Sequence, residues 1–109
     1  MEDKKTKFKG LLNEMFTTYV AKNHDYGDSF GESIREYGPI AGAAQIMHKH
    51  NRLKTLVKGE SNKVGESIRD TLMDMANYCV MLVMEMDCLG LDTTPTSGKQ
   101  LLTETGEKK

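Results

Sequence analysis

The sequence contains no tryptophan, two prolines and two cysteines among its 109 residues. Because proline interrupts helices, its scarcity leaves long stretches in which helices can run unbroken. Cys79 and Cys88 have neither the spacing of a metal site nor that of a redox motif, and Cys79 is expected in the core. These features favour a helical protein of a reducing compartment, and we expect it in the cytoplasm.

Long apolar runs and an excess of either charge are also missing. No run approaches the ~20 apolar residues that span a bilayer, and the charged N-terminal segment lacks the apolar centre of a signal peptide. The formal net charge is −1, which predicts no attraction to nucleic acid or to an anionic membrane. We therefore expect no membrane and no direct nucleic-acid partner.

Apolar residues recur at helical spacing in three segments, which predicts three main helices. The predicted helices run from about Asp3 to Lys22, from Pro39 to about Lys58, and from about Glu66 to Leu89. A short fourth helix is expected over Ser29–Tyr37, closed by the glycine and proline that follow it. The sequence therefore predicts an all-α fold, a small helical bundle of three main helices plus one short helix.

The last predicted helix is apolar around nearly its whole circumference, since Leu82, Val83 and Met84 follow one another. Such a helix needs neighbours on every side, and one chain of this length does not supply them. We therefore expect a homo-oligomer, a dimer or a tetramer, to complete the bundle. Residues 1–92 are assigned to one helical domain, and residues 93–109 to a flexible tail because they lack periodicity.

An acidic pair, Asp70 and Asp74, lies one turn apart on the last predicted helix and is continued by Asn77. Met81 and Met84 extend the same face, so another helix is expected to cover it. Burying two carboxylates without a cation is costly, and a divalent ion with oxygen ligands would offset the cost.

Glu66, one turn before Asp70, is a candidate third metal ligand. The alternative is that these acidic residues simply favour the N-terminal helix dipole and stay solvated. A lone amide at Asn77 weakens that alternative, because a polar group among apolar residues needs a specific partner.

Asp25 and Asp28 flank a Tyr26-Gly27 turn after the first predicted helix. Glycine there permits a positive φ and the close approach of a ligand to the backbone. The alternative is a helix stop followed by an N-cap, with Tyr26 and Phe30 packed on the core.

The segment HKHNRLK, residues 48–54, places Lys49 and Arg52 on one helix face, an arrangement suited to a chain of phosphates. His50 lies on the apolar line of its helix and is expected in the core, whereas His48 is expected to be exposed. Histidines two residues apart do not face each other on a helix, so the sequence offers little support for zinc.

Three pieces follow one another along the chain: Lys22 with DYGDSF, Lys49 with Arg52 and Leu53, and Asp70, Asp74 and Asn77 within DTLMDMANY. In this order they resemble the nucleotide-modification-associated domain-one family of small phage and prophage proteins, over about residues 19–85. That family is similar, more remotely, to the all-α nucleotide pyrophosphohydrolases of the MazG and dimeric dUTPase type. Those enzymes hold magnesium with carboxylates on helices, and water attacks the α-phosphorus of a nucleoside triphosphate.

The resemblance implies a Mg²⁺-dependent nucleotide pyrophosphohydrolase, located in the host cytoplasm if it is phage-encoded. The implied roles are metal binding by Asp70 and Asp74 together with Glu66, phosphate binding by Lys22, Lys49 and Arg52, and base or sugar contacts by Tyr26 or Asn77. Asp25 and Asp28 are the implied catalytic residues, with Asp25 as the candidate general base.

One departure from the MazG pattern leaves alternatives open. Those enzymes carry a Glu-x-x-Glu motif on the preceding helix, and the helix predicted from Pro39 contains no acidic residue. Asp25 and Asp28, or else Glu32 and Glu36, would have to substitute for it. A protein that binds and sequesters a nucleotide without cleaving it, for example in counter-defence, is the second hypothesis. A Met-rich helical adaptor is the third, although it leaves the acidic pair unexplained.

Overall fold

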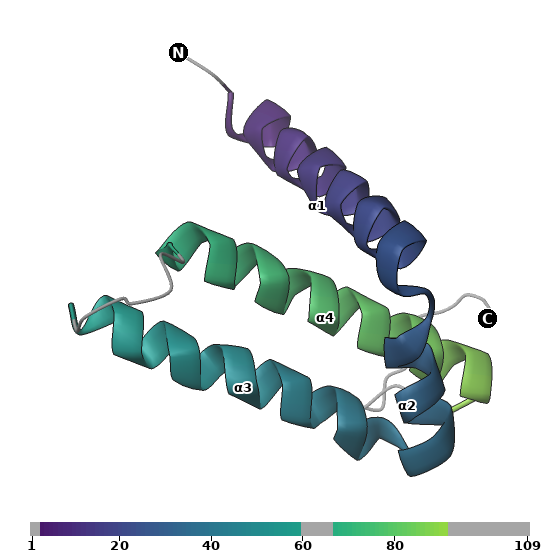
Figure 1. Ribbon diagram of the computed structural model, residues 1–109. Coiled ribbons are helices and arrows are strands. Elements are labelled where there is room, and N and C mark those ends of the chain that lie inside the picture. Colours follow the sequence, from purple (N-terminus) through teal and green to yellow (C-terminus); the bar gives the residue numbers. More distant parts are fainter. Residues whose placement is uncertain (1–2, 60–66, 92–109) are drawn as a thin grey trace, which may run out of the picture.

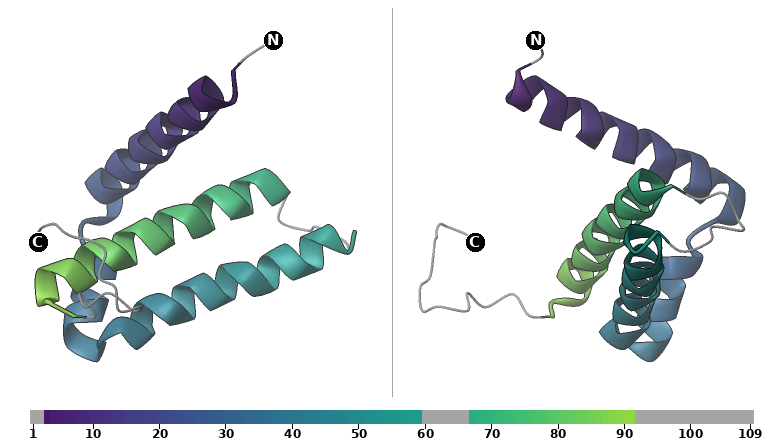
Figure 2. Two further views of the ribbon diagram at one scale, coloured as in Figure 1. Left: turned by 180° about the vertical axis from the view of Figure 1, so that it is seen from behind. Right: turned by 90° about the vertical axis from the view of Figure 1, so that its left-hand side faces the viewer.

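The computed structural model describes residues 3–59 and 67–91, and these form four helices and no strand. The helices are α1 (Lys4–Tyr26), α2 (Ser29–Tyr37), α3 (Pro39–Val57) and α4 (Ile68–Leu89). The antiparallel helices α3 and α4 lie side by side, α2 packs across one end of the pair, and α1 extends away from it (Figures 1 and 2). The predicted all-α fold and the order of its helices are confirmed for this part of the chain.

The prediction that the first helix ends near Lys22 is wrong, because α1 continues for four more residues. Its last turn contains polar residues that favour turns, yet the helix ends only where Gly27 adopts a φ of 71°. The N–H of Gly27 donates to the carbonyl of Asn23 at 2.8 Å and closes that turn. Asp25 therefore lies in the last turn of a helix and not in a loop.

The start of α4 also differs from the prediction by two residues. Ser67 is the N-cap, and its hydroxyl accepts a hydrogen bond from the backbone N–H of Asp70 at 2.9 Å. Serine is among the preferred N-cap residues because its oxygen satisfies such an orphan N–H group. Glu66 lies outside the described residues, as do residues 93–109, which were assigned to the tail.

Gly42 of α3 is buried against the side chain of Leu82 on α4. A Cβ atom at position 42 would lie 2.7 Å from one methyl carbon of Leu82 and 3.3 Å from its Cγ. The fully buried side chains of Ile34 and Thr71 and the buried Leu56 complete this small core. The absence of a side chain at position 42 therefore sets how near the two helices approach.

We expect Gly42→Ala to lower stability by about 1 kcal/mol. Overpacking costs about 1–3 kcal/mol, and the better helix propensity of alanine offsets about 1 kcal/mol of it. Gly10→Ala is the matched control, since a Cβ there meets nothing within 4 Å, and it should raise stability slightly. Thermal unfolding monitored by circular dichroism would measure the stability of both variants. A Gly42→Ala protein as stable as Gly10→Ala would contradict the packing described.

Two polar contacts near the middle of α1 attach it to α4, in addition to the ion pair between Lys22 and Asp74. The guanidinium of Arg69 donates two hydrogen bonds to the carboxylate of Glu14, at 2.7 and 2.8 Å. At the next residue of α1, the carbonyl of Met15 accepts a hydrogen bond from the side-chain amide of Asn77 at 3.3 Å. These contacts set the position of α1 on a helix with which it shares little apolar surface.

Arg69 lowers the pKa of Glu14 below its ordinary value of 4.5, chiefly through its hydrogen bonds. Since the folded state favours the carboxylate, this contact contributes stability above pH 4.5 and loses it as the pH falls through the lowered pKa. An NMR titration should therefore find a higher Glu14 pKa in Arg69→Gln than in the wild type. Equal values in the two proteins would show that the contact does not form in solution.

A large apolar surface remains exposed on the single chain. Among the described residues, the buried hydrophobic side chains are Ile34 and Leu56, whereas fifteen large hydrophobic residues are exposed. Cys79 and His50, both expected in the core, are exposed as well, because their helix faces have no neighbour within the described part of the chain. No helix in the described ranges is long and apolar enough to cross a membrane.

Candidate functional site

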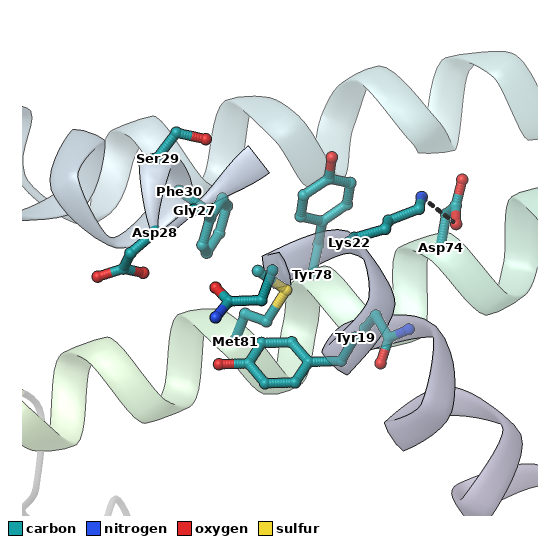
Figure 3. Close-up of a pocket in the computed structure, with 11 residues that line it drawn as sticks. Tyr19, Lys22, Gly27, Asp28, Ser29, Phe30, Asp74, Tyr78 and Met81 are labelled. Atoms are coloured by element: carbon teal, nitrogen blue, oxygen red, sulfur yellow. Dashed lines mark hydrogen bonds and ion pairs between the residues drawn. The ribbon is translucent and has the colours of Figure 1, made fainter. Parts of the chain in front are cut away.

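A cleft of 120 Å³ opens where the end of α1, the start of α2 and the middle of α4 meet (Figure 3). Its α4 wall consists of residues spaced by three and four, which share one face of a helix. The lining residues are Tyr19, Lys22, Asn23, Gly27, Asp28, Ser29, Phe30, Asp74, Asn77, Tyr78 and Met81. Of these, the sequence predicted Lys22, Asp28, Asp74 and Asn77 as site residues.

Asp74 lies between two lysines that come from two other helices. Its carboxylate oxygens are 3.4 Å from the ammonium group of Lys22 on α1 and 3.2 Å from that of Lys49 on α3. The side chains of Asp74 and Lys49 are each 24% exposed, so this cluster is partly shielded from solvent. Two cations around one carboxylate leave a net positive charge, which attracts an anion.

Arg52 follows Lys49 by three residues on α3 and is half-buried. Residues at this spacing lie on neighbouring positions of one helix face. The structure thus brings together Lys22, Lys49 and Asp74, and it places Arg52 one turn from the nearer lysine.

The described residues do not by themselves form a magnesium site. No three His, Cys, Asp or Glu side chains among them lie close enough together to hold a metal ion. Asp70 is exposed in the first turn of α4, and both oxygens of Asp74 face lysines. Mg²⁺ needs several oxygen ligands in near-octahedral geometry, and the two ammonium groups would repel it.

Asp28, one of the two predicted catalytic residues, lines the cleft but pairs with a neighbouring arginine. Its carboxylate accepts a hydrogen bond from Arg35 at 2.8 Å, and Arg35 also donates to Glu85 on α4 at 3.0 Å. Asp28, and to a lesser degree Glu85, raises the pKa of Arg35. Figure 3 shows Asp28 at the opposite end of the cleft from Lys22, with its carboxylate directed away from that lysine.

Arg35 and Glu85 were not predicted from the sequence, and neither was the close packing beneath them. The buried Gly31 lies against this cluster, and a Cβ there would come within 2.6 Å of the Asp28 carboxylate. The ion pairs fix the start of α2 against α4 and so hold one wall of the cleft. A spacing of seven residues between Asp28 and Arg35 is compatible with a pair on one face, but nothing in the sequence indicates Glu85 as the third member.

Asp25, the candidate general base, does not line the cleft. Its side chain is 65% exposed and lies 3.2 Å from the ring of His24. Glu32 and Glu36, the alternative acidic pair, are exposed on α2. The side chain of Tyr26 lies outside the described part of the structure.

Phe30 and Tyr78 form the aromatic wall of the cleft. Their ring centroids are 5.3 Å apart with the planes tilted by 40°, a geometry that favours an aromatic pair. The sequence predicted Phe30 to pack on the core, and it is half-buried against Tyr78. The place of Tyr78 in the cleft was not predicted, because the spacing of a tyrosine along its own helix does not indicate which residue of another helix it contacts.

The fold and the cleft define a small all-α protein whose polar site joins three helices through two lysines and an aspartate. The chain matches the family model described as nucleotide modification associated domain 1 over residues 22–86, and it belongs to this family. The match includes Lys22, Lys49 and Asp74, the complete charged cluster. No curated protein and no solved structure matches the chain at a significant level.

Proposed function

We propose that this protein binds a nucleotide and that Lys22 and Lys49 hold its phosphate groups. The observation that carries the proposal is the single carboxylate of Asp74 placed between two ammonium groups in a cleft. Lysine is a common phosphate ligand because its ammonium is a compact charge with three donors. The family description, which associates these domains with nucleotide modification, supports the same class of ligand.

Asp74 acts in this proposal as the counter-ion of both lysines before the ligand arrives. A polyphosphate carries several negative charges, so it competes with one carboxylate for the same ammonium groups. The aromatic rings of Phe30 and Tyr78 line the cleft beside the lysines and offer a stacking surface. The cleft of 120 Å³ is smaller than the roughly 300–1,000 Å³ of pockets for whole drug-sized ligands, so it accommodates only part of a nucleotide.

Mg²⁺-dependent pyrophosphohydrolysis is the second candidate function. It is favoured by the position of Asp74 in the same cleft as the lysines, with Asp70 one turn before it. Because the other described carboxylate of the cleft, that of Asp28, pairs with Arg35, a metal would need ligands from Glu66 or from a second copy of the chain.

One experiment tests binding and hydrolysis together. The purified protein is mixed with a panel of nucleoside triphosphates, with Mg²⁺ or with a chelator, and both the thermal shift and the release of pyrophosphate are recorded. We expect a nucleotide-dependent increase in the melting temperature that persists in the chelator. Pyrophosphate release that needs Mg²⁺ would assign hydrolysis in addition. The absence of any shift or turnover would refute both and favour a protein–protein adaptor.

We also propose that the chain functions as a homo-oligomer. Exposed apolar residues recur on α1 at Phe8, Leu12, Phe16 and Val20, each four residues after the last, and further ones lie on α4. Monomeric proteins rarely expose contiguous apolar patches larger than a few hundred Å². A second copy presents the same apolar surface, which is the condition for a symmetric interface.

A further inference from the structure

A second cavity, of 230 Å³, shares its aromatic wall with the cleft that contains the lysines. Ser29, Phe30 and Tyr78 line both cavities. Residues of α1 complete the first cavity, whereas the second is completed by Ser33 and Tyr37 of α2 together with Ala41 and Gln45 of α3. The two cavities are therefore adjacent, and the pair of rings stands in the wall of each.

Among the described residues that line the second cavity, none has a charged side chain. Hydroxyl groups of serine and tyrosine, the amide of Gln45 and the aromatic rings make up its chemistry. A glutamine amide offers both donors and an acceptor, and proteins recognise unstacked bases through aromatic stacking combined with hydrogen bonds to the base edges. This lining suits a flat, uncharged ring with hydrogen-bonding edges and does not suit a phosphate group.

The second cavity is also continuous with the lysine cluster along α3. Ala41, Gln45 and Lys49 are spaced by four residues and lie on one face of that helix. Gln45 and Lys49 are about 6 Å apart along the helix axis, at about 1.5 Å per residue. Lys49 in turn reaches Asp74 at 3.2 Å.

We propose that this cavity binds the nucleobase of the nucleotide whose phosphates Lys22 and Lys49 hold. The inference rests on the proposed function and adds to it the location of the base and the residues that select it. Gln45 reads the edge of the base, Ser33 adds a hydroxyl, and Tyr37 and Tyr78 provide the flanking rings. The sugar then lies between Gln45 and Lys49.

The test measures the binding of two kinds of probe by titration calorimetry, namely the common nucleoside triphosphates and inorganic tripolyphosphate. Gln45→Ala should weaken the binding of the tightest-binding nucleoside triphosphate by about tenfold, the effect expected when a polar group of a ligand loses its hydrogen-bond partner. It should also reduce the difference in affinity between nucleotides with different bases. It should leave tripolyphosphate binding within about twofold. Asn51→Ala is the matched control, because it removes an exposed amide from another face of α3.

Ser33→Ala provides a second variant on α2 and should act in the same direction as Gln45→Ala. If both variants bind nucleotides and tripolyphosphate as the wild type does, the base site is refuted while the phosphate site stands. If the wild-type protein binds neither probe, the proposed function fails, and the base site fails with it. Equal losses for both probes in Gln45→Ala would also refute the base site, because they would indicate a general disturbance of α3.

Discussion

Replacing both lysines of the charged cluster, as Lys22→Gln with Lys49→Gln, should weaken nucleotide binding by about 100-fold or more. Hydrogen bonds to charged groups contribute about 1.5–3 kcal/mol each, and 1.4 kcal/mol corresponds to a factor of ten. Affinity for tripolyphosphate should fall as far, since both lysines contact phosphate and not the base. The control is Lys54→Gln with Lys58→Gln, which removes the same charge from exposed positions.

The double variant leaves the partly buried carboxylate of Asp74 without its partners, which reduces stability as well as binding. The triple variant that also carries Asp74→Asn removes this unpaired charge and should regain stability without regaining affinity. Circular dichroism before titration separates a folding defect from a binding defect. Unchanged nucleotide affinity in the folded triple variant would place the phosphate site elsewhere.

Asp74→Asn alone distinguishes the two candidate functions at the same site. In a chelator the substitution frees both lysines from a competing carboxylate, so nucleotide affinity should rise severalfold. If Asp74 instead holds Mg²⁺ beside the phosphates, the variant should bind more weakly than the wild type whenever Mg²⁺ is present. The sign of the change with and without metal therefore decides between a phosphate clamp and a metal centre.

Introducing a charge into the exposed apolar surface should dissociate the proposed oligomer into monomers. Phe16 on α1 is 66% exposed and Val83 on α4 is 57% exposed in the single chain. Covering two thirds of a phenylalanine removes on the order of 130 Å² from water and contributes about 3 kcal/mol per protomer. Phe16→Glu loses this contribution and adds the cost of a buried charge, so the dissociation constant should rise by more than about 100-fold.

Sedimentation or light scattering over a range of concentrations measures this change. Asn13→Glu is the control, because it adds the same charge at an exposed polar position of α1. Val83→Glu should act as Phe16→Glu does if α1 and α4 both contribute to the interface. A wild-type protein that remains monomeric at tens of micromolar would refute the proposed assembly, as would a Phe16→Glu protein that associates like the wild type.

The helices could be predicted because their signals are local. The apolar spacing in three segments, the proline after Gly38 and the glycines at 27, 38 and 90 mark elements and their ends through interactions within a few residues. The two errors, at the end of α1 and the start of α4, concern single helix turns. The end of α1 was placed too early because residues that favour turns are also tolerated in a terminal helix turn. The start of α4 was placed too early because Ser67 is the N-cap and precedes the helix.

The residues of the site were only partly predictable. Lys22, Lys49, Asp74 and Asn77 were selected by residue type and order, and the structure places the first three together and Asn77 beside them. Phe30, Tyr78, Gln45 and Arg35 were not selected, because each has its role only through a partner on another helix. Asp25 and Asp70 fit the sequence pattern equally well, yet both are exposed outside the lysine–aspartate contacts.

The sequence by itself determined that the chain is helical, where most of the helices lie, and that one acidic stripe adjoins an apolar surface. These properties follow from spacing and composition, which act over one or two helix turns. Only the tertiary structure decided that Asp74 faces two lysines and not other carboxylates, because that depends on how α1 and α3 pack against α4. The acidic pair that suggested a metal site is thereby divided into an exposed Asp70 and an Asp74 that pairs with Lys22 and Lys49.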